Sequence, residues 1–282
     1  MQHRYNWMTR VLVLGGSGRV GTMLRRVWAH DSADVTFTYQ TRNPDATDDM
    51  LWDVLHAPVP AQTPFACMIA LSGVVPAPGA DLALNTALGV AAVEAAAHLD
   101  IPAVLLASSS AVYGSAGNAP FTEDTPLAPV NDYGRAKQEM ETACQTRATA
   151  AGVHLCCLRI GNVAGADALL RNGAALEVGA KLRLDRFADG GTPLRSYIGP
   201  QTLAQVLMSL VTARRGMPPV LNIAAPRPVT MQTLAQAAQL PFDLVPAGSG
   251  AHKNITLDGI AKLLASACEA WQRQDHATIS AV

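Results

Sequence analysis

Clusters of charge and long apolar runs are both missing from this sequence. Charged side chains make up only 15% of its 282 residues, and 21 basic side chains stand against 22 acidic ones. Because nucleic-acid binding needs clustered Lys and Arg, we expect no nucleic-acid partner. No apolar run approaches the roughly 18 residues that span a bilayer, so we expect no membrane partner either.

Cysteine pairs and metal-binding spacings are also lacking. The five cysteines are odd in number and form no CxxC, which is typical of reduced core thiols in a cytoplasmic protein. The seven histidines show neither HxxxH nor HExxH spacing, so we expect no metal site. The first apolar stretch, Val11–Leu14, is too short for the core of a signal peptide, and we expect a cytoplasmic location.

Apolar residues are abundant, at 49%, and short buried-strand patterns alternate with longer helical ones. This alternation is typical of βαβ units and a parallel sheet. Right-handed crossovers then give a doubly wound Rossmann sheet, an α/β fold. The expected strands are Val11–Leu14, Val35–Tyr39, Phe65–Leu71, Ala103–Ala107 and Val153–Leu158, and the expected helices are Arg19–Ala29, Asp81–Leu99 and Asn131–Ala151.

The helix Asp81–Leu99 consists mostly of Ala, Leu and Val on every face. A helix that is apolar all round is covered on both sides. One cover would be the sheet, and the other would be either loops of the same chain or a second subunit. We expect a homodimer, with coverage by the chain's own loops as the alternative.

A glycine-rich turn follows the first expected strand and precedes the first expected helix. It matches GxGxxG and GxxGxxG, and its residues are Gly15, Gly16, Ser17, Gly18, Arg19, Val20 and Gly21. Glycine permits the tight turn and lets a pyrophosphate approach the backbone, while the helix N-terminus offers free N–H groups to the anion. We therefore expect all seven residues to bind a dinucleotide, with a purely structural turn as the alternative.

The end of the second expected strand distinguishes NAD from NADP, because an acid there binds the adenosine ribose of NAD. This chain has Gln40-Thr41-Arg42 instead, with no acid before Asp45. Arg42 can pair with the 2′-phosphate of NADP, and Arg19 can assist. We therefore favour NADP within an NAD(P) site, with two solvated surface arginines as the alternative.

Three further residues are expected to contact this cofactor. Asp53 is a candidate partner for the adenine amino group, although a capping or turn role is nearly as well supported. Leu71 and Ser72 stand at the end of the third expected strand, and the carboxyl ends of parallel strands line the ligand crevice.

The pattern loosens after Gly161, where Gly and Pro often interrupt the chain. Helical patterns return at Gln201–Ala213, Thr230–Gln239 and Leu257–Gln272. We predict an NAD(P)-binding Rossmann domain at residues 1–160 and a small C-terminal lobe at residues 161–282 that mainly binds substrate. Residues of about 201–223 are expected to return to the Rossmann core.

Tyr133 and Lys137 stand four residues apart in an expected helix and so share one helix face. The run Ser108-Ser109-Ser110 follows the fourth expected strand, whose carboxyl end would line the same crevice. A phenol, an ammonium and a hydroxyl are therefore expected beside the cofactor.

These groups suit hydride transfer between a carbinol carbon and nicotinamide, which needs a proton to move on the oxygen. A tyrosine of pKa about 10 is a poor base at neutral pH. An adjacent Lys137 ammonium, with the nicotinamide ring, would lower the pKa of Tyr133 and could bind the nicotinamide ribose. Ser109 and Ser110 would hold the substrate oxygen. The alternative is a surface Tyr133 with Lys137 in a salt bridge.

Together these features resemble the extended short-chain dehydrogenase/reductase family, and within it the NAD-dependent epimerase/dehydratase branch. The resemblance runs in order from about Val11 to Leu210. The similar segments are SSSAVYG at 108–114 (family SSxxVYG), TEDTPL at 122–127 before Tyr133 and Lys137 (E-x-x-P…YxxxK), LRIGNVAG at 158–165 (LRxxNVYG) and RSYI at 195–198 (R-x-Y/F-I).

By motif position, the resemblance implies Ser109 as the catalytic serine, Tyr133 as the acid/base and Lys137 as its activator. It also implies that Asn162 and Arg195 contact a sugar-nucleotide phosphate. The alternatives for these two are a strand-end cap and a surface arginine.

The chain departs from the branch in ways that narrow the chemistry. Dehydratases of the branch carry an Asp-Glu pair where this chain has Ser110 and Ala111, so dehydration is not expected. The family usually has an acidic residue after R-x-Y-I-x-x-x, and this chain has Thr202 at that position. Ala164 replaces the tyrosine of NVYG. The chain is also shorter than most members, which would suit a smaller substrate such as a sugar, sugar acid or lactone.

The leading interpretation is an enzyme, an NAD(P)-dependent oxidoreductase or 4-epimerase acting on a sugar-like carbinol or ketone. The expected partner is a small-molecule substrate, with a nucleotide sugar also allowed. The competing interpretation is a non-catalytic NADP-binding sensor of the same fold. Such proteins usually lose the Tyr or the Lys, and this chain has both.

Overall fold

The computed structural model describes residues 9–31, 35–43, 49–61, 64–115, 119–214, 216–248, 251 and 254–258. The expected helix Leu257–Gln272 lies almost wholly outside the described residues, as does Cys268. Leu257, its first residue, instead forms an isolated parallel β-bridge with Phe121. The expected start of that helix is therefore wrong.

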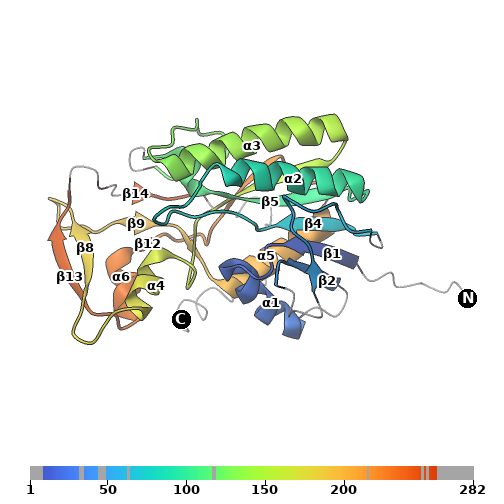
Figure 1. The fold of residues 1–282 in the computed structure, drawn as a ribbon. Helices are drawn as coiled ribbons and strands as arrows, with labels where there is room; N and C mark the ends of the chain where they lie inside the picture. The colour runs from blue at the N-terminus through green and yellow to red at the C-terminus, as the bar shows by residue number, and fades with distance from the viewer. Residues whose placement is uncertain are drawn as a thin grey trace, which may run out of the picture. The chain divides into compact units, whose positions relative to one another are not determined.

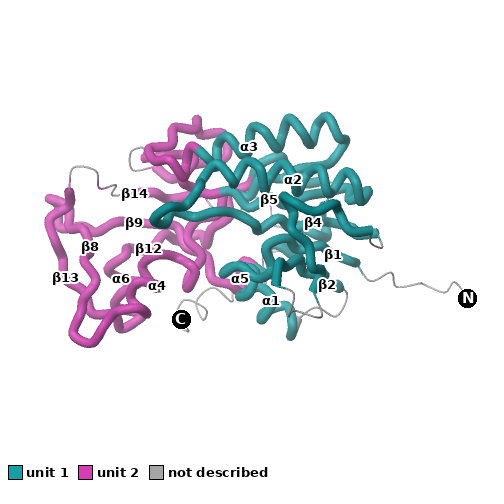
Figure 2. Tube along the Cα trace, viewed as in Figure 1, with its two compact units in different colours: residues 1–108, 136–158, 204–220 teal, residues 109–135, 159–203, 221–282 magenta. Residues whose placement is uncertain are grey.

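The chain divides into two compact units, which Figure 2 colours separately. Unit 1 holds residues 1–108, 136–158 and 204–220, and unit 2 holds residues 109–135, 159–203 and 221–282. The sequence analysis divided the chain at residue 160 into a cofactor-binding part and a substrate-binding part. That division concerns what each part binds, and it stays a prediction.

A seven-stranded sheet has the strand order β11-β6-β5-β4-β1-β2-β3. The pairs β1–β2, β1–β4, β2–β3 and β4–β5 are all parallel. The chain therefore builds outward from β1 in both directions, and the strand order reverses between β1 and β4. This confirms the predicted α/β, doubly wound parallel sheet. Its strands are β1 (Thr9–Leu14), β2 (Val35–Thr41), β3 (Met50–Leu51), β4 (Cys67–Ala70), β5 (Ala103–Ser109), β6 (His154–Ile160) and β11 (Val220–Ile223).

Helices cover both faces of this sheet (Figure 1). They are α1 (Arg19–Asp31), α2 (Leu84–His98), α3 (Asp132–Ala151) and α5 (Pro200–Ala213). In unit 1, α2 and α3 lie on one face, and α1 and α5 lie on the other (Figure 1). The indole Nε1 of Trp28 in α1 donates a hydrogen bond to the Ala204 carbonyl of α5 at 3.4 Å.

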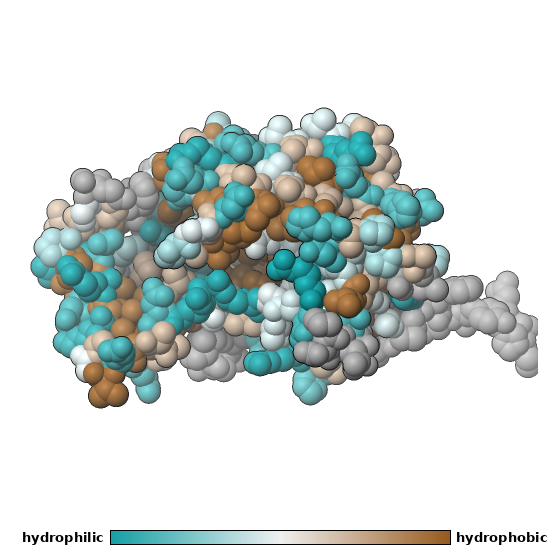
Figure 3. Space-filling model, in the orientation of Figure 1, coloured by the Kyte–Doolittle hydropathy of each residue, from teal (hydrophilic) through white to brown (hydrophobic). Residues whose placement is uncertain are grey.

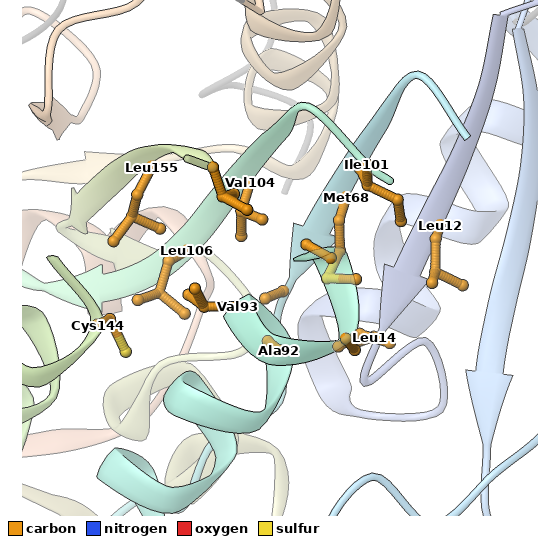
Figure 4. Close-up of a cluster of buried hydrophobic side chains, with 14 of the residues drawn as sticks. Leu12, Leu14, Met68, Ala92, Val93, Ile101, Val104, Leu106, Cys144 and Leu155 are labelled. Carbon is orange, nitrogen blue, oxygen red and sulfur yellow. The ribbon is translucent and has the colours of Figure 1, made fainter. Parts of the chain in front are cut away.

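The core of unit 1 forms where α2 packs on the sheet. Ala92 and Val93 of α2 lie against Met68 and Leu106 of the strands in Figure 4, and all four are buried. Burying one large apolar side chain contributes about 1.5–3 kcal/mol. Gly89 lets α2 approach α3, because a Cβ there would lie 2.7 Å from the sulfur of Cys144.

Unit 2 contains shorter elements than unit 1. Three small sheets pair β10 with β7, β9 with β12 and β14, and β13 with β8. The elements are η1 (Ser110–Tyr113), β7 (Asn162–Val163), α4 (Ala168–Ala174), β8 (Leu182–Arg186), β9 (Leu194–Arg195), β10 (Tyr197–Ile198), β12 (Val229–Thr230), α6 (Met231–Ala237), β13 (Phe242–Pro246) and β14 (Asn254–Ile255). The expected helix at Thr230–Gln239 is thus present as α6.

Side-chain caps start both short helices of unit 2. The Asp167 carboxylate accepts from Leu170 N at the start of α4, and the Thr230 hydroxyl accepts from Thr233 N at the start of α6. Each cap satisfies an N–H group that has no partner within the helix. The two helices share a small apolar core with β8 that includes Leu169, Leu182, Leu184, Tyr197, Leu234 and Ala235.

The surface of the described residues is mixed, as Figure 3 shows. Several large apolar side chains are nevertheless exposed, among them Val75 and Leu84 in unit 1 and Val178 in the turn before β8. No helix among the described residues is long and apolar enough to cross a membrane. Nor do those residues contain a group of three or more His, Cys, Asp or Glu side chains placed to hold a metal ion.

Candidate active site

The glycine-rich turn lies between β1 and α1 and is packed too closely for side chains. Gly15 has φ +75°, and a Cβ there would lie 2.7 Å from the backbone N of Ser72. A Cβ on Gly16 would meet the Tyr39 side chain at 2.9 Å, and one on Gly21 would meet the Gly15 carbonyl oxygen at 2.5 Å. Three of the four glycines are therefore required by the fold of unit 1 itself.

The outer side of the turn is open. Ser17, Gly18 and Arg19 are exposed, and Val20 is half-buried. A Cβ on Gly18 would meet only the Gly15 carbonyl oxygen, at 3.1 Å. Because α1 begins at Arg19, its first N–H groups belong to this open side, as an anion site requires.

Residues 35–43, the described part of β2 and its end, contain no carboxylate. The Gln40 side chain accepts from Gly15 N at 3.0 Å and donates to the Trp52 carbonyl at 2.5 Å, so its amide is used inside unit 1. Arg42 is exposed. The structure thus leaves the proposed 2′-phosphate role of Arg42 as a prediction.

The Asp53 side chain accepts a hydrogen bond within a turn, which is the alternative role that the sequence analysis gave for it. Its Oδ1 accepts from Leu55 N at 3.1 Å and lies 3.2 Å from His56 Nδ1. The Leu55 hydrogen bond, followed by that of His56, lowers the pKa of this exposed carboxyl. Contact with adenine stays a prediction.

The residues after β4 adjoin the glycine turn. Leu71 N donates to the Leu14 carbonyl at 2.9 Å, which extends the pairing of β4 with β1. The backbone of Ser72 supplies the atoms closest to a Cβ on Gly15. Both residues therefore lie beside the turn, as expected.

A pocket of about 220 Å³ in unit 2 contains most of the expected catalytic and substrate residues. Its lining includes Ser109, Ser110, Tyr133, Asn162 and Arg195. These come from the end of β5, η1, the start of α3, β7 and β9. Residues far apart in sequence are thus brought to one hollow.

Tyr133 is hydrogen-bonded to the Ser109 side chain in this pocket. Burial raises the pKa of the Tyr133 hydroxyl, and the bond to Ser109 lowers it by less. The pKa of this phenol is therefore raised in the protein alone, and the expectation of a lowered pKa beside a nicotinamide ring stays a prediction. The physical reason for the raised pKa is that burial disfavours the phenolate, and burial could not be seen in the sequence.

Lys137 lies one helical turn further along α3, within unit 1, and is 4% exposed. Its Nζ donates to the Ala107 carbonyl of β5 at 3.0 Å. Burial lowers the pKa of Lys137 to about 8. Lys137 is therefore a buried residue of unit 1 and not a surface lysine.

Arg195 and Asn162 contribute the polar groups on the other elements of the pocket. Arg195 Nη1 donates to the Leu194 carbonyl at 2.9 Å, and burial lowers the pKa of the guanidinium. Asn162 N donates to the Ser196 carbonyl at 2.8 Å, where β7 meets β10. The Asn162 backbone therefore contributes to the pairing of β7 with β10, and Asn162 also lines the pocket.

Sequence reasoning did not identify several lining residues, among them Val130, Asn131, Ser196 and Ile255. Asn131 gave a signal, since its side chain accepts from Gly134 N and so caps the start of α3. Also missed was a buried network in unit 2, in which Tyr113 donates to Asn222 at 2.7 Å and accepts from Arg159 at 2.9 Å. Long-range pairs of this kind leave no local pattern.

The sequence is similar to those of several curated proteins. A UDP-glucose 4-epimerase of Azospirillum brasilense is 32% identical over 151 residues, which cover 47% of this chain and 43% of that protein. A UDP-glucose 4-epimerase of Streptococcus mutans is 28% identical over 191 residues, which cover 60% of this chain and 57% of that protein. The chain spans about half the length of these curated relatives.

Solved structures share the fold. The structure described as MoeE5 in complex with UDP-glucose and NAD superposes with a TM-score of 0.73 at 21% identity, over 91% of this chain and 92% of that one. The sequence of residues 11–224 matches the NAD dependent epimerase/dehydratase family, and that match covers most of the chain. The protein therefore belongs to the NAD dependent epimerase/dehydratase family.

Proposed function

We propose that the protein is a nicotinamide-dependent 4-epimerase of a nucleotide sugar or a related sugar-like carbinol. The observation that carries this proposal is the pocket in unit 2 that holds Tyr133 bonded to Ser109 together with Asn162 and Arg195. The curated relatives named UDP-glucose 4-epimerase support the choice of reaction.

The glycine turn fits a dinucleotide. Its glycines pack against β2 and the segment after β4, while the open side carries Gly18 and the first N–H groups of α1. We propose that this side holds the pyrophosphate and that Lys137 holds the nicotinamide ribose. When bound, the nicotinamide would accept and return the hydride of the reacting carbon.

The chain's own residues would manage the proton and the substrate. Tyr133 would take the proton from the carbinol oxygen and later return it, and Ser109 would hold that oxygen. Burial opposes the phenolate, so a neighbouring positive charge is needed. Lys137 stands four residues after Tyr133 on α3, and that spacing supports it as the source of this charge.

Arg195 and Asn162 are proposed to hold the rest of the substrate. A guanidinium pairs well with phosphate or carboxylate oxygens, and an amide can bind sugar hydroxyls. Arg195 is the charged residue in the described lining of the pocket, and no carboxylate is among that lining. This charge favours an anionic substrate, such as a nucleotide sugar or a sugar acid.

Dehydration is not part of the proposal. Ser110 and Ala111 stand where the family resemblance expects an Asp-Glu pair, and both line the pocket. Neither side chain ionises near neutral pH, so neither can remove a carbon-bound proton. The pocket therefore supports transfer of hydride without elimination of water.

We also propose that NADP binds in preference to NAD. The described residues of β2 and its end, residues 35–43, contain no carboxylate, the Gln40 amide is used inside unit 1, and Arg42 is exposed. Comparative titration of NADPH and NADH by fluorescence tests this. Tighter NADPH binding that weakens in Arg42→Ala is expected, and tighter NADH binding in the unmutated protein would contradict the proposal.

A homodimer through α2 and α3 is the proposed assembly. These helices form a shallow groove of about 500 Å³, lined by Ala83, Thr86, Gln138, Glu139, Thr142 and Ala143. A dimer would cover the outer side of α2, whose composition is apolar on every face. Light scattering after size-exclusion chromatography should give twice the chain mass of 29.6 kDa.

The reaction is tested by incubating the purified protein with UDP-glucose and following UDP-galactose. Interconversion with cofactor that stays bound is expected for an epimerase. Net oxidation with exchangeable cofactor would instead indicate a dehydrogenase or reductase. Cofactor binding without turnover on nucleotide sugars, sugars or sugar acids would indicate a sensor and would overturn the enzyme proposal.

A further inference from the structure

A buried carboxylate lies in unit 1 on the inner side of α3, outside the residues assigned to the site so far. Glu141 is 7% exposed, and Ser108 of β5 is 6% exposed. The Ser108 hydroxyl donates to Glu141 Oε1 at 2.5 Å. A buried carboxylate fixed in this way needs a reason, because removing a charge from water is costly unless the charge is paired.

Lys137 stands one helical turn before Glu141 on the same face of α3 and is equally buried. Its ammonium donates to the Ala107 carbonyl and lies 3.7 Å from the Met140 sulfur. A carbonyl and a thioether carry no negative charge. They therefore cannot by themselves compensate the burial of an ammonium.

The titratable groups that face Lys137 are Cys144 and Glu141 of α3 and Cys157 of β6. Each would favour the ammonium if it were ionised. Burial, however, raises the pKa of the Cys144 thiol to about 12, so this thiol is neutral near pH 7. Glu141 is the carboxylate among these three groups, and the Ser108 hydroxyl holds it in place.

The side of Lys137 toward the segment after β4 is also defined. A Cβ on Gly73 would lie 3.2 Å from Lys137 Nζ and 3.0 Å from Asn85 Oδ1. The Asn85 amide is bonded to the backbone of Val74 and Leu82 and is uncharged. Among the described residues of unit 1, Glu141 is thus the carboxylate that acts on the Lys137 ammonium.

We propose that the Ser108–Glu141 pair is a positioning device that keeps Lys137 protonated and fixed near neutral pH. Ser108 of β5 holds the carboxylate, Glu141 compensates the ammonium, and the Ala107 carbonyl of the same strand accepts a hydrogen bond from the ammonium. The consequence for turnover rests on the proposed function, but the electrostatic claim does not. It also gives Ser108 a role distinct from that of Ser109.

The Lys137 charge can be measured directly, because the chain contains only four lysines. Lysine labelled with 13C and 15N gives few side-chain signals in an NMR pH titration, and the signal lost in Lys137→Arg assigns the residue. We expect the wild-type Lys137 pKa to be near 8. In Glu141→Gln we expect it to fall by at least one unit, because burial then acts without compensation.

Glu139→Gln is the matched control, since it removes the same charge from a more solvent-accessible position on the same helix. It should leave the Lys137 titration unchanged. Ser108→Ala should shift the Lys137 pKa in the same direction as Glu141→Gln but by less. A Glu141→Gln protein whose Lys137 titrates as in wild type would overturn the proposal, as would an equal shift in Glu139→Gln.

Two outcomes keep this proposal separable from the proposed function. The NMR titration needs neither cofactor nor substrate, so the expected shift in a protein without turnover would support the Ser108–Glu141 role and reject only the enzyme. If Glu141→Gln does not fold, the Ser108→Ala titration decides alone. In an active protein, the alkaline limb of the pH–rate profile should move to lower pH in Glu141→Gln, a move that a purely structural defect would not produce.

Discussion

At the scale of single residues, Tyr133 carries the proposed chemistry. It is half-buried beside Ser109 in the pocket, and burial raises the pKa of its hydroxyl. Tyr133→Phe removes the proton donor and acceptor while keeping the ring and its packing. Turnover should fall by about 10²–10⁴-fold, and cofactor affinity should stay within a few-fold of wild type. Steady-state rates and a fluorescence titration of the cofactor check the two parts; unchanged turnover would remove Tyr133 from the mechanism.

Lys137 gives a prediction on pH. Burial lowers its pKa to about 8, so the ammonium is lost as the pH rises through that value. Activity that depends on this charge should therefore decline above about pH 8 and recover on return to neutral pH. A pH–rate profile with saturating substrate tests this, and a profile that stays flat to pH 10 contradicts the role of the ammonium.

The residue scale also shows the limit of the sequence. The spacing of Tyr133 and Lys137 indicated a shared helix face, and both do lie on α3. Their pKa directions depend on burial, which is set by residues distant in sequence and so could not be read from the spacing. Glu141 gave no signal because its partner Ser108 stands 33 residues away.

At the scale of elements, the glycine turn combines two demands. Gly15 needs a positive φ and leaves no room for a Cβ, whereas Gly79 has φ +74° and would leave a Cβ with no neighbouring atom within 4 Å. Gly15→Ala should destabilise the protein by about 1–3 kcal/mol more than Gly79→Ala, which carries the backbone strain alone. Urea denaturation of both variants measures this difference, and equal losses would show that the contact with Ser72 is not limiting.

Elements with strong local patterns were predictable, and short ones were not. The apolar runs of β1, β4, β5 and β6 indicated strands, and the structure has them with ends shifted by a few residues. The two-residue strands β7, β9, β10, β12 and β14 are held by partners in unit 2 rather than by their own composition. A pattern two residues long cannot indicate a strand, so the elements that carry Asn162 and Arg195 into the pocket could not be predicted from their own sequence.

At the scale of the whole molecule, buried thiols predict a loss of stability in alkali. Burial raises the pKa of Cys67, Cys144 and Cys156 to about 12 each. Between about pH 9 and 12 the native state therefore keeps protons that the unfolded chain loses, and the free energy of unfolding falls as pH rises. Each thiol contributes a slope of at most about 1.4 kcal/mol per pH unit.

Cys156→Ala isolates one of these contributions. Its unfolding free energy should fall less steeply with pH above 9 than that of the wild-type protein, even though the variant is less stable at pH 7. Urea denaturation at several pH values, in the presence of a reductant, gives both slopes. Parallel slopes for the two proteins would mean that Cys156 does not stay protonated in the native state.

The central claim is that the protein moves a hydride from and back to one carbon of a sugar. The most direct measurement uses UDP-galactose carrying deuterium at C4, incubated with the purified protein, with the product analysed by NMR. The account predicts UDP-glucose that retains deuterium at the inverted C4, with no such product from Tyr133→Phe. Product that carries a solvent proton at C4, or recovery of unchanged substrate with bound cofactor, would contradict it.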